Sequence, residues 1–246
     1  ICGGCALQHF DHASQIAFKE ARLAGLFAPF KPGMFLSALH GSPDAYRSKA
    51  RLGVKYVIKR DEVLVGFREK ASPFVADMSD CSVLDQRIAA LIAPLKSMIS
   101  SLTVKAAIPQ IEVAASEDMV VLVVRHLEAL VSEDVNILGQ FSSKHGIRMM
   151  TQTAGPESVI PLPGEAQAVL SYSLRSEGLT FEFEPLDFTQ VNFSMNEQMT
   201  NQALELLNLQ ADDQVIDAFC GIGNFTLPIA KRVTSVLGLE SAEASV

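Results

Sequence analysis

The feature that most constrains the fold is a paired-glycine turn between two short apolar runs close to the end of the sequence. Gln214 to Phe219 has the character of a short buried strand, Asn224 to Lys231 of a helix, and Thr234 to Glu240 of a second buried strand. Gly221 and Gly223 lie where the first strand should end, and residues without a Cβ allow a tight turn whose backbone amides can approach a ligand. The order strand, glycine turn, helix, strand predicts the opening of a doubly wound α/β sheet.

The spacing within this unit indicates the kind of ligand. Glu240 closes the second strand 23 residues after Asp217, where a carboxylate can accept hydrogen bonds from both hydroxyls of an adenosine ribose. A dinucleotide fingerprint normally has three glycines as GxGxxG, and the third glycine is absent after Gly223. We therefore favour S-adenosylmethionine (SAM) over a nicotinamide dinucleotide, with a turn that binds nothing as a further alternative. Cys220 lies in the same turn without an activating partner placed by the sequence, so we interpret it as a packed thiol.

The other cysteines suggest a metal site. Cys2 and Cys5 form a CxxC motif, which in a reducing compartment serves redox chemistry or metal binding more often than a disulfide. A thioredoxin-like site needs a βαβ context, which the helix expected next does not provide. Cys81 is the natural third thiolate, and a closed site needs a fourth ligand. That ligand is expected upstream of the sequence, or His9 or His12 completes a zinc site. Zinc and an iron–sulfur cluster fit the spacing equally, and the absence of any metal stays open.

The rest of the sequence mixes expected strands and helices without strict alternation. Alternating apolar residues indicate hairpins, and apolar residues at helical spacing indicate helices, one of which Pro94 should kink or divide. The expected hairpins span residues 51–68, 108–125 and 172–183, the expected helices span 13–27, 83–102 and 131–145, a strand is expected at 147–153, and a further helix begins at a capping box of Ser194 and Glu197. We therefore expect an α+β domain over residues 1–184 and the first part of an α/β, Rossmann-like domain over residues 185–246.

Composition bears on location and partners. The chain of 246 residues is 48% apolar, which is enough for two cores. It shows neither an uncharged apolar run of about 18 residues nor a signal-peptide pattern, so we expect no membrane span and a cytoplasmic location. The net charge of −8 argues against a surface coated with phosphate-binding side chains, but residues 45–70 hold eight basic and three acidic residues. An RNA-facing patch and a solvated strand face explain that basic cluster equally well. Because the sequence starts without methionine and stops just after an expected strand, both ends are expected to be truncated.

Several motifs together resemble those of one known family. They are Ile1-Cys2-Gly3-Gly4-Cys5 with Gln8-His9, Tyr46-Arg47-Ser48-Lys49-Ala50-Arg51-Leu52, Val65-Gly66-Phe67-Arg68, Asp187-Phe188-Thr189-Gln190-Val191-Asn192, and residues 217–228. With these motifs nearly the whole chain resembles the uracil-5 RNA methyltransferases, especially the iron–sulfur bacterial enzymes that methylate a uridine in 23S ribosomal RNA. The resemblance implies a central α+β domain followed by a Rossmann-like, SAM-dependent methyltransferase domain. It also implies ribosomal RNA as partner, no membrane association and a monomer.

The resemblance further implies roles for residues at matching positions. The implied ligands of a 4Fe-4S cluster are Cys2, Cys5 and Cys81, with the family's first cysteine falling before Ile1. The implied SAM contacts are Gln190, Phe219, Asn224 and Glu240.

The chemistry of the family explains why no catalytic residue is assigned. A cysteine thiolate adds to carbon 6 of uracil, the resulting enolate attacks the SAM methyl group, and a base then removes the proton from carbon 5. Both groups lie in the family's later sequence, so the chain alone is expected to lack turnover. Two alternatives of other classes stay open: a non-catalytic RNA- or metal-binding module, and a nicotinamide-dependent oxidoreductase.

Overall fold

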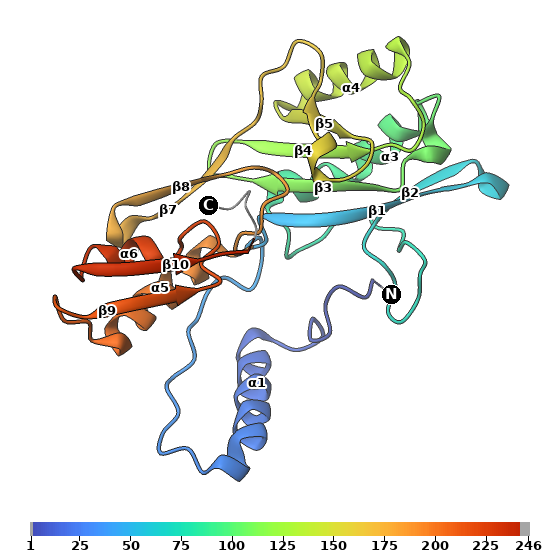
Figure 1. Cartoon of the computed structure of the whole chain (residues 1–246). Coiled ribbons are helices and arrows are strands. Elements are labelled where there is room, and N and C mark those ends of the chain that lie inside the picture. Colours follow the sequence, from blue (N-terminus) through green and yellow to red (C-terminus); the bar gives the residue numbers. More distant parts are fainter. Residues whose placement is uncertain (1, 242–246) are drawn as a thin grey trace.

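A six-stranded sheet is the centre of the structure, a computed structural model that describes residues 2–241 (Figure 1). Its strands are β1 (Lys49–Val57), β2 (Glu62–Gly66), β3 (Gln110–Ala115), β4 (Val120–Arg125), β5 (Arg148–Gln152) and β6 (Ile160–Pro161). They lie in the order β2-β1-β3-β4-β5-β6, with β4 and β5 parallel and the other neighbouring pairs antiparallel. Because β1 pairs with β3 as well as with β2, the first two predicted hairpins join in one sheet.

Helices cover one face of this sheet. They are α2 (Gln86–Ala89), α3 (Ile92–Ser100) and α4 (Ser132–His145). The predicted helix at 83–102 is divided as expected, and Pro94 lies in the first turn of α3, where a missing amide removes no intrahelical hydrogen bond. Every second strand residue points into the core beneath these helices because successive strand side chains alternate between faces. Fully buried side chains of this core are Leu52, Ile88, Ile92, Leu95, Ile111, Leu122 and Leu138.

A hairpin of β7 (Leu170–Leu174) and β8 (Leu179–Phe183) packs against the opposite face of the sheet. The buried Tyr172 ring stacks between Phe181 and Phe193, with ring centroids 5.0 and 5.1 Å away. Two buried clusters are thus present, one on each face of a single sheet. The boundary between residues 184 and 185 stays a prediction.

The last part of the chain opens an α/β unit, as the glycine turn predicts. Its elements are α5 (Phe193–Leu207), β9 (Gln214–Ala218), α6 (Thr226–Ala230) and β10 (Ser235–Leu239). β9 and β10 are parallel and form a two-stranded sheet of their own, on which Ile216, Leu237 and Leu239 are about half exposed or more.

The start of α5 differs from the prediction. The helix is capped by Asn192, whose Oδ1 accepts a hydrogen bond from the Met195 amide at 3.0 Å. The predicted capping box of Ser194 and Glu197 is wrong, because Glu197 instead accepts a hydrogen bond from the Ser176 amide at 2.8 Å. Asparagine is among the best N-cap residues, and here it lies two residues earlier.

An arm built on α1 (His12–Phe27) extends away from the sheet (Figure 1). Asp11 caps the helix by accepting from the Ser14 amide at 2.9 Å, yet α1 has no buried residue. Short 3-10 turns complete the chain: η1 (Ala28–Phe30), η2 (Ile58–Arg60), η3 (Lys105–Ala107), η4 (Pro156–Ser158) and η5 (Arg175–Glu177). Among residues 2–241, no helix combines the length and apolar character needed to cross a membrane.

Candidate functional site

The glycine turn follows the carboxyl end of β9 and places an aromatic ring in solvent. Phe219 has a backbone φ of +64°, and Gly221 and Gly223 have φ of +54° and +86°. Left-handed geometry is common for glycine but strained for a bulky residue, and such strain concentrates at functional sites. The Phe219 side chain is 86% exposed, so packing does not explain why this strain is kept. A flat apolar face at a strand end suits a stacked planar ligand.

Glu240 lies beside this turn because β9 and β10 run in parallel. The register pairs Ala218 with Leu239, so Glu240 leaves β10 at the same edge where the turn leaves β9. Its Oε2 accepts a hydrogen bond from the Gly221 amide at 2.9 Å. A carboxylate therefore lies at the carboxyl edge of the parallel strands, hydrogen-bonded to a backbone amide of the glycine turn. This is the arrangement that the spacing predicts.

The side chain of Asn224 is hydrogen-bonded to other parts of the protein. Its Oδ1 accepts hydrogen bonds from the Tyr172 hydroxyl at 2.9 Å and from Asn196 Nδ2 at 2.7 Å. Its Nδ2 donates to Asn196 Oδ1 at 3.0 Å and to Thr200 Oγ1 at 3.4 Å. The carboxamide is thus saturated by protein groups, and it ties the turn to α5 and to the β7–β8 hairpin. A contact from Asn224 to a cofactor would have to use its backbone.

Burial and ion pairing reinforce this attachment. Burial raises the pKa of Tyr172, which keeps its hydroxyl protonated as the donor to Asn224. Arg232, just after α6, donates to both carboxylate oxygens of Glu177 at 2.7 and 2.8 Å. The Arg232 guanidinium holds the pKa of the buried Glu177 carboxyl below its ordinary value. Sequence reasoning missed Tyr172, Asn196 and Glu177 because their partners lie 28 to 55 residues away.

Cys220 is packed as predicted. A Cβ at Gly238 of β10 would lie 2.9 Å from Cys220 Sγ, so the thiol occupies the space that this glycine leaves open. Beside it, Thr226 Oγ1 donates to Asp217 Oδ2 at 2.6 Å and fixes the start of α6 against β9. Neither contact offers Cys220 a base.

Gln190 is exposed and lies in the segment that leads into α5. The backbone oxygen of its neighbour Val191 accepts from the amide and the hydroxyl of Ser48, at 2.8 and 3.0 Å, so the segment is fixed to the start of β1. Among residues 2–241, no hydrogen bond connects Gln190 with the glycine turn. Its role as a cofactor contact stays a prediction.

The three cysteines proposed as ligands are free thiols on two segments of the fold. Cys2 and Cys81 are half-buried against the helix-covered core, and Cys5 is exposed. The Gly4 amide donates to Cys2 Sγ at 3.4 Å, a bond that also suits a ligating thiolate. Within residues 2–241, no three histidine, cysteine or carboxylate side chains gather as a metal-ligating group. The donor chemistry therefore fits a cluster in part, but the described residues do not bring three ligands together.

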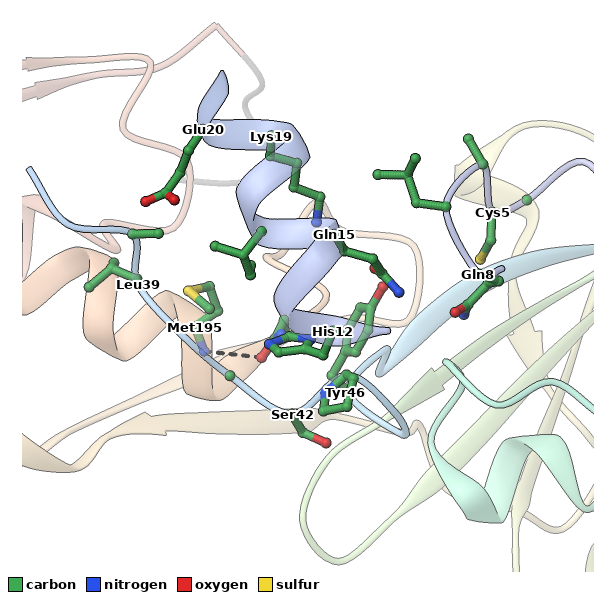
Figure 2. A pocket seen from close by; sticks show the side chains of 18 residues that line it. Cys5, Gln8, His12, Gln15, Lys19, Glu20, Leu39, Ser42, Tyr46 and Met195 are labelled. Atoms are coloured by element: carbon green, nitrogen blue, oxygen red, sulfur yellow. Dashed lines mark hydrogen bonds between the residues drawn. The ribbon is translucent and has the colours of Figure 1, made fainter. Parts of the chain in front are cut away.

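A cavity of about 580 Å³ adjoins one of these cysteines, Cys5. Figure 2 shows Cys5 and Gln8 on one side, His12 and Gln15 on α1, and Tyr46 among the other labelled side chains that line the cavity. Asn192 and Met195 at the start of α5 also line it, so the cavity connects the CxxC segment with the segment that carries Gln190. Burial raises the pKa of Tyr46, and the neighbouring Cys5 and Cys81 raise it further. Tyr46 thus lies within electrostatic reach of both thiols.

Comparisons with known proteins agree on one family. Residues 11–246 match the sequence model of the family described as tRNA (Uracil-5-)-methyltransferase. The 23S rRNA (uracil(1939)-C(5))-methyltransferase RlmD of Hahella chejuensis is 47% identical over 250 residues, covering 100% of this chain and 56% of that protein. The proteins of the same name from Nitrosospira multiformis and Bordetella pertussis are 43% and 42% identical, over 249 and 247 residues, and cover 100% and 99% of this chain. Those two alignments span 57% and 53% of the respective relatives.

A solved structure shows the same fold. The tRNA (uracil-54, C5)-methyltransferase of Pyrococcus abyssi, in complex with S-adenosyl-L-homocysteine, superimposes with a TM-score of 0.71 at 19% identity, covering 99% of this chain and 60% of that one. The mixed α/β architecture expected from the sequence is thereby confirmed. The chain spans about half the length of the curated relatives it matches.

Proposed function

This chain belongs to the tRNA (uracil-5-)-methyltransferase family, and on that basis we propose that the protein methylates carbon 5 of a uridine in 23S ribosomal RNA, with SAM as methyl donor. The observation that carries the proposal is the pairing of the exposed, strained Phe219 with Glu240 at the carboxyl edge of β9 and β10. The names of the relatives favour ribosomal RNA as the substrate. Such a substrate would also place the protein in the cytoplasm, where we expect it to act as a monomer.

The chain's own residues would bind and position the donor. The Phe219 ring would stack on the adenine, and the Glu240 carboxylate would accept hydrogen bonds from the ribose hydroxyls. Asn224 would act indirectly, by holding the turn against α5 and the β7–β8 hairpin. SAM, when bound, supplies an electrophilic methyl group. We assign no catalytic residue within residues 1–246.

The proposal is tested in the full-length protein by SAM titration and by transfer of labelled methyl groups to 23S ribosomal RNA. Phe219→Ala and Glu240→Gln should each weaken SAM binding, while Phe74→Ala, which removes another exposed ring at 70% exposure, should not. Label at carbon 5 of one uridine supports the assignment. Failure of the full-length protein to bind SAM would favour a non-catalytic RNA- or metal-binding module, and preferential binding of NADH would favour an oxidoreductase.

We also propose that Cys2, Cys5 and Cys81 provide three of the four ligands of a 4Fe-4S cluster. Support comes from the free thiols, from the amide bond to Cys2 Sγ, and from the position of Cys2 and Cys81 against one core. Anaerobically purified full-length protein should contain iron and acid-labile sulfide and absorb visible light. Cys81→Ser should lose the iron, the sulfide and the visible absorbance, while Cys220→Ser should keep all three. Zinc in place of iron, or equal iron in both variants, would refute the cluster.

A further inference from the structure

The face of the six-stranded sheet that bears the β7–β8 hairpin also carries a row of polar side chains. The strand register places Gln110 of β3 opposite Arg125 of β4, and Arg125 opposite Gln152 of β5. Residues two positions along the same strands, such as Val123 and Met150, pack under the hairpin. Because alternate residues of a strand share a face, the polar row lies on the same face of the sheet as the residues under the hairpin, just beyond the part that the hairpin covers.

A cavity of about 240 Å³ lies over this row. Lys49, Arg51 and Glu112 line it together with the three residues of the row, and Pro156 and Leu186 contribute apolar walls. Sites for whole small molecules commonly enclose roughly 300–1,000 Å³. This cavity is therefore suited to one chemical group of a larger ligand rather than to a complete cofactor.

Arg125 lacks a partner that its position requires. Its Nε is buried and has no hydrogen-bond partner within residues 2–241. Buried polar groups in folded proteins are nearly always hydrogen-bonded, because an unsatisfied one retains the full penalty of its desolvation. Gln152, the cross-strand neighbour of Arg125, is only 5% exposed. The cavity thus presents a half-buried cation whose buried Nε lacks an acceptor within residues 2–241.

The charges around the cavity favour an anion. Arg51 forms an ion pair with Glu112, so these two charges offset each other. Lys49 donates from Nζ to the backbone oxygen of Asp187, and the carboxylates of Asp187 and Glu112 both act on it electrostatically. The lining therefore holds three cations, Lys49, Arg51 and Arg125, against the single carboxylate of Glu112. Among residues 2–241, no carboxylate is hydrogen-bonded to Lys49 or Arg125. Arginine, lysine and amide groups together form a set of donors that matches the acceptor oxygens of a phosphate.

We propose that this cavity binds a backbone phosphate of the RNA substrate, with Arg125 as its principal ligand. The inference rests on the proposed function for its RNA, but it concerns binding, not methyl transfer. Lys49 connects the cavity with the segment before α5 through Asp187, and Ser48 holds the same segment through Val191. A phosphate in the cavity would therefore fix an RNA strand beside the segment that carries Gln190. A base edge is a poorer match, because it presents donors as well as acceptors.

The test measures binding of a 23S ribosomal RNA fragment to full-length protein over a series of salt concentrations. Arg125→Gln should weaken binding by roughly tenfold or more and flatten the slope of log affinity against log salt by about 0.7, the contribution of one phosphate contact to a single strand. Point changes in the RNA sequence should not alter the size of the effect. Lys144→Gln is the control, because it removes one positive charge from an exposed position on α4, which covers the opposite face of the sheet and lies outside the basic cluster of residues 45–70.

A second variant separates binding from folding. Gln152→Glu places a carboxylate next to Arg125, so it should raise the melting temperature while lowering RNA affinity. A parallel titration with inorganic phosphate should raise the melting temperature of the unmodified protein but not that of Arg125→Gln.

The inference is overturned if Arg125→Gln leaves the salt slope unchanged, or if Lys144→Gln flattens it equally. It is also overturned if inorganic phosphate binds at Arg125 while Arg125→Gln leaves RNA affinity unchanged. Each of these results can occur in a protein that still methylates RNA, so they leave the proposed function intact. Absence of both methylation and RNA binding in the unmodified protein would instead defeat the proposed function.

Discussion

Removing the hydroxyl of Tyr172 tests how the glycine turn is held in place. Tyr172→Phe deletes one hydrogen bond to Asn224 Oδ1, while the ring keeps its stacking on Phe181 and Phe193. Because Asn196 still donates to the same oxygen, no acceptor is left unsatisfied. The free energy of unfolding should therefore fall by about 0.5–1.5 kcal/mol, the net value of one hydrogen bond.

Removing the carboxamide should cost more than removing the hydroxyl. Asn224→Ala leaves the Tyr172 hydroxyl and the Asn196 carboxamide without their partners in a buried place. Each unsatisfied group costs about 1–3 kcal/mol, so a loss of roughly 2–4 kcal/mol is expected, since neighbouring effects do not add fully. Since burial raises the pKa of Tyr172, the difference between the two variants should not change between about pH 6 and 9.

The assay is denaturant unfolding of the full-length protein, followed by calorimetric titration with SAM under native conditions. Ser173→Ala is the control. Ser173 lies next to Tyr172 on β7, and its hydroxyl makes an exposed hydrogen bond with the Thr180 hydroxyl on β8, so its removal should change stability by less than about 0.5 kcal/mol. Tyr172→Phe should weaken SAM binding by less than roughly tenfold. If Asn224→Ala instead abolished SAM binding at unchanged stability, the carboxamide would contact the cofactor directly and our account of it would be refuted.

Three further predictions address other parts of the structure. Phe219→Gly removes a side chain from a left-handed position, so it should raise stability by about 1 kcal/mol and still weaken SAM binding; a loss of stability in thermal melts would contradict the assignment of strain. Glu177 has a folded pKa below its ordinary value of 4.5, so its ion pair with Arg232 stabilises the fold above that pH, and this stabilisation is lost as the pH falls through the lowered pKa. Glu177→Gln should therefore reduce the fall of the melting temperature below about pH 4.5. An unchanged profile would show that the ion pair does not cause that fall. Burial lowers the pKa of Lys49 to about 8, so Lys49 loses its charge as the pH rises past that value, and RNA affinity should drop there. Lys49→Arg should remove this drop. If the drop persists in that variant, another group titrates.

Local patterns predicted the local elements well. Two patterns were informative: apolar residues that alternate within β1 and β2, and glycines that follow an apolar run. Each pattern extends over about 25 residues or fewer, and both the first hairpin and the unit from β9 to β10 appear where expected. The division of the helix near Pro94 was also foreseen, since proline cannot donate within a helix. Which of several polar side chains caps a helix was harder to predict, since α5 is capped by Asn192 and not by Ser194.

Features that depend on distant pairing could not be predicted. Nothing in the sequence places Gln110, Arg125 and Gln152 in one row, because their alignment follows from the register of three strands. The hydrogen bonds of the Asn224 carboxamide likewise depend on Tyr172 and Asn196, which are distant in sequence. The cofactor contact that the family resemblance implies for Asn224 stays a prediction. The cysteines are on segments that the sequence alone cannot bring together, and residues 2–241 do not gather them.

The parallel pair β9 and β10 has a practical consequence for anyone who handles this polypeptide. Parallel strands are normally covered on both faces, yet Ile216, Leu237 and Leu239 are 66%, 54% and 49% exposed. Exposed apolar strands with unpaired edges recruit other strands, so a preparation of these 246 residues alone should become turbid on concentration or warming, and in a cell it should be held by chaperones. Replacing Ile216 and Leu237 with threonine would keep the strand preference and improve solubility.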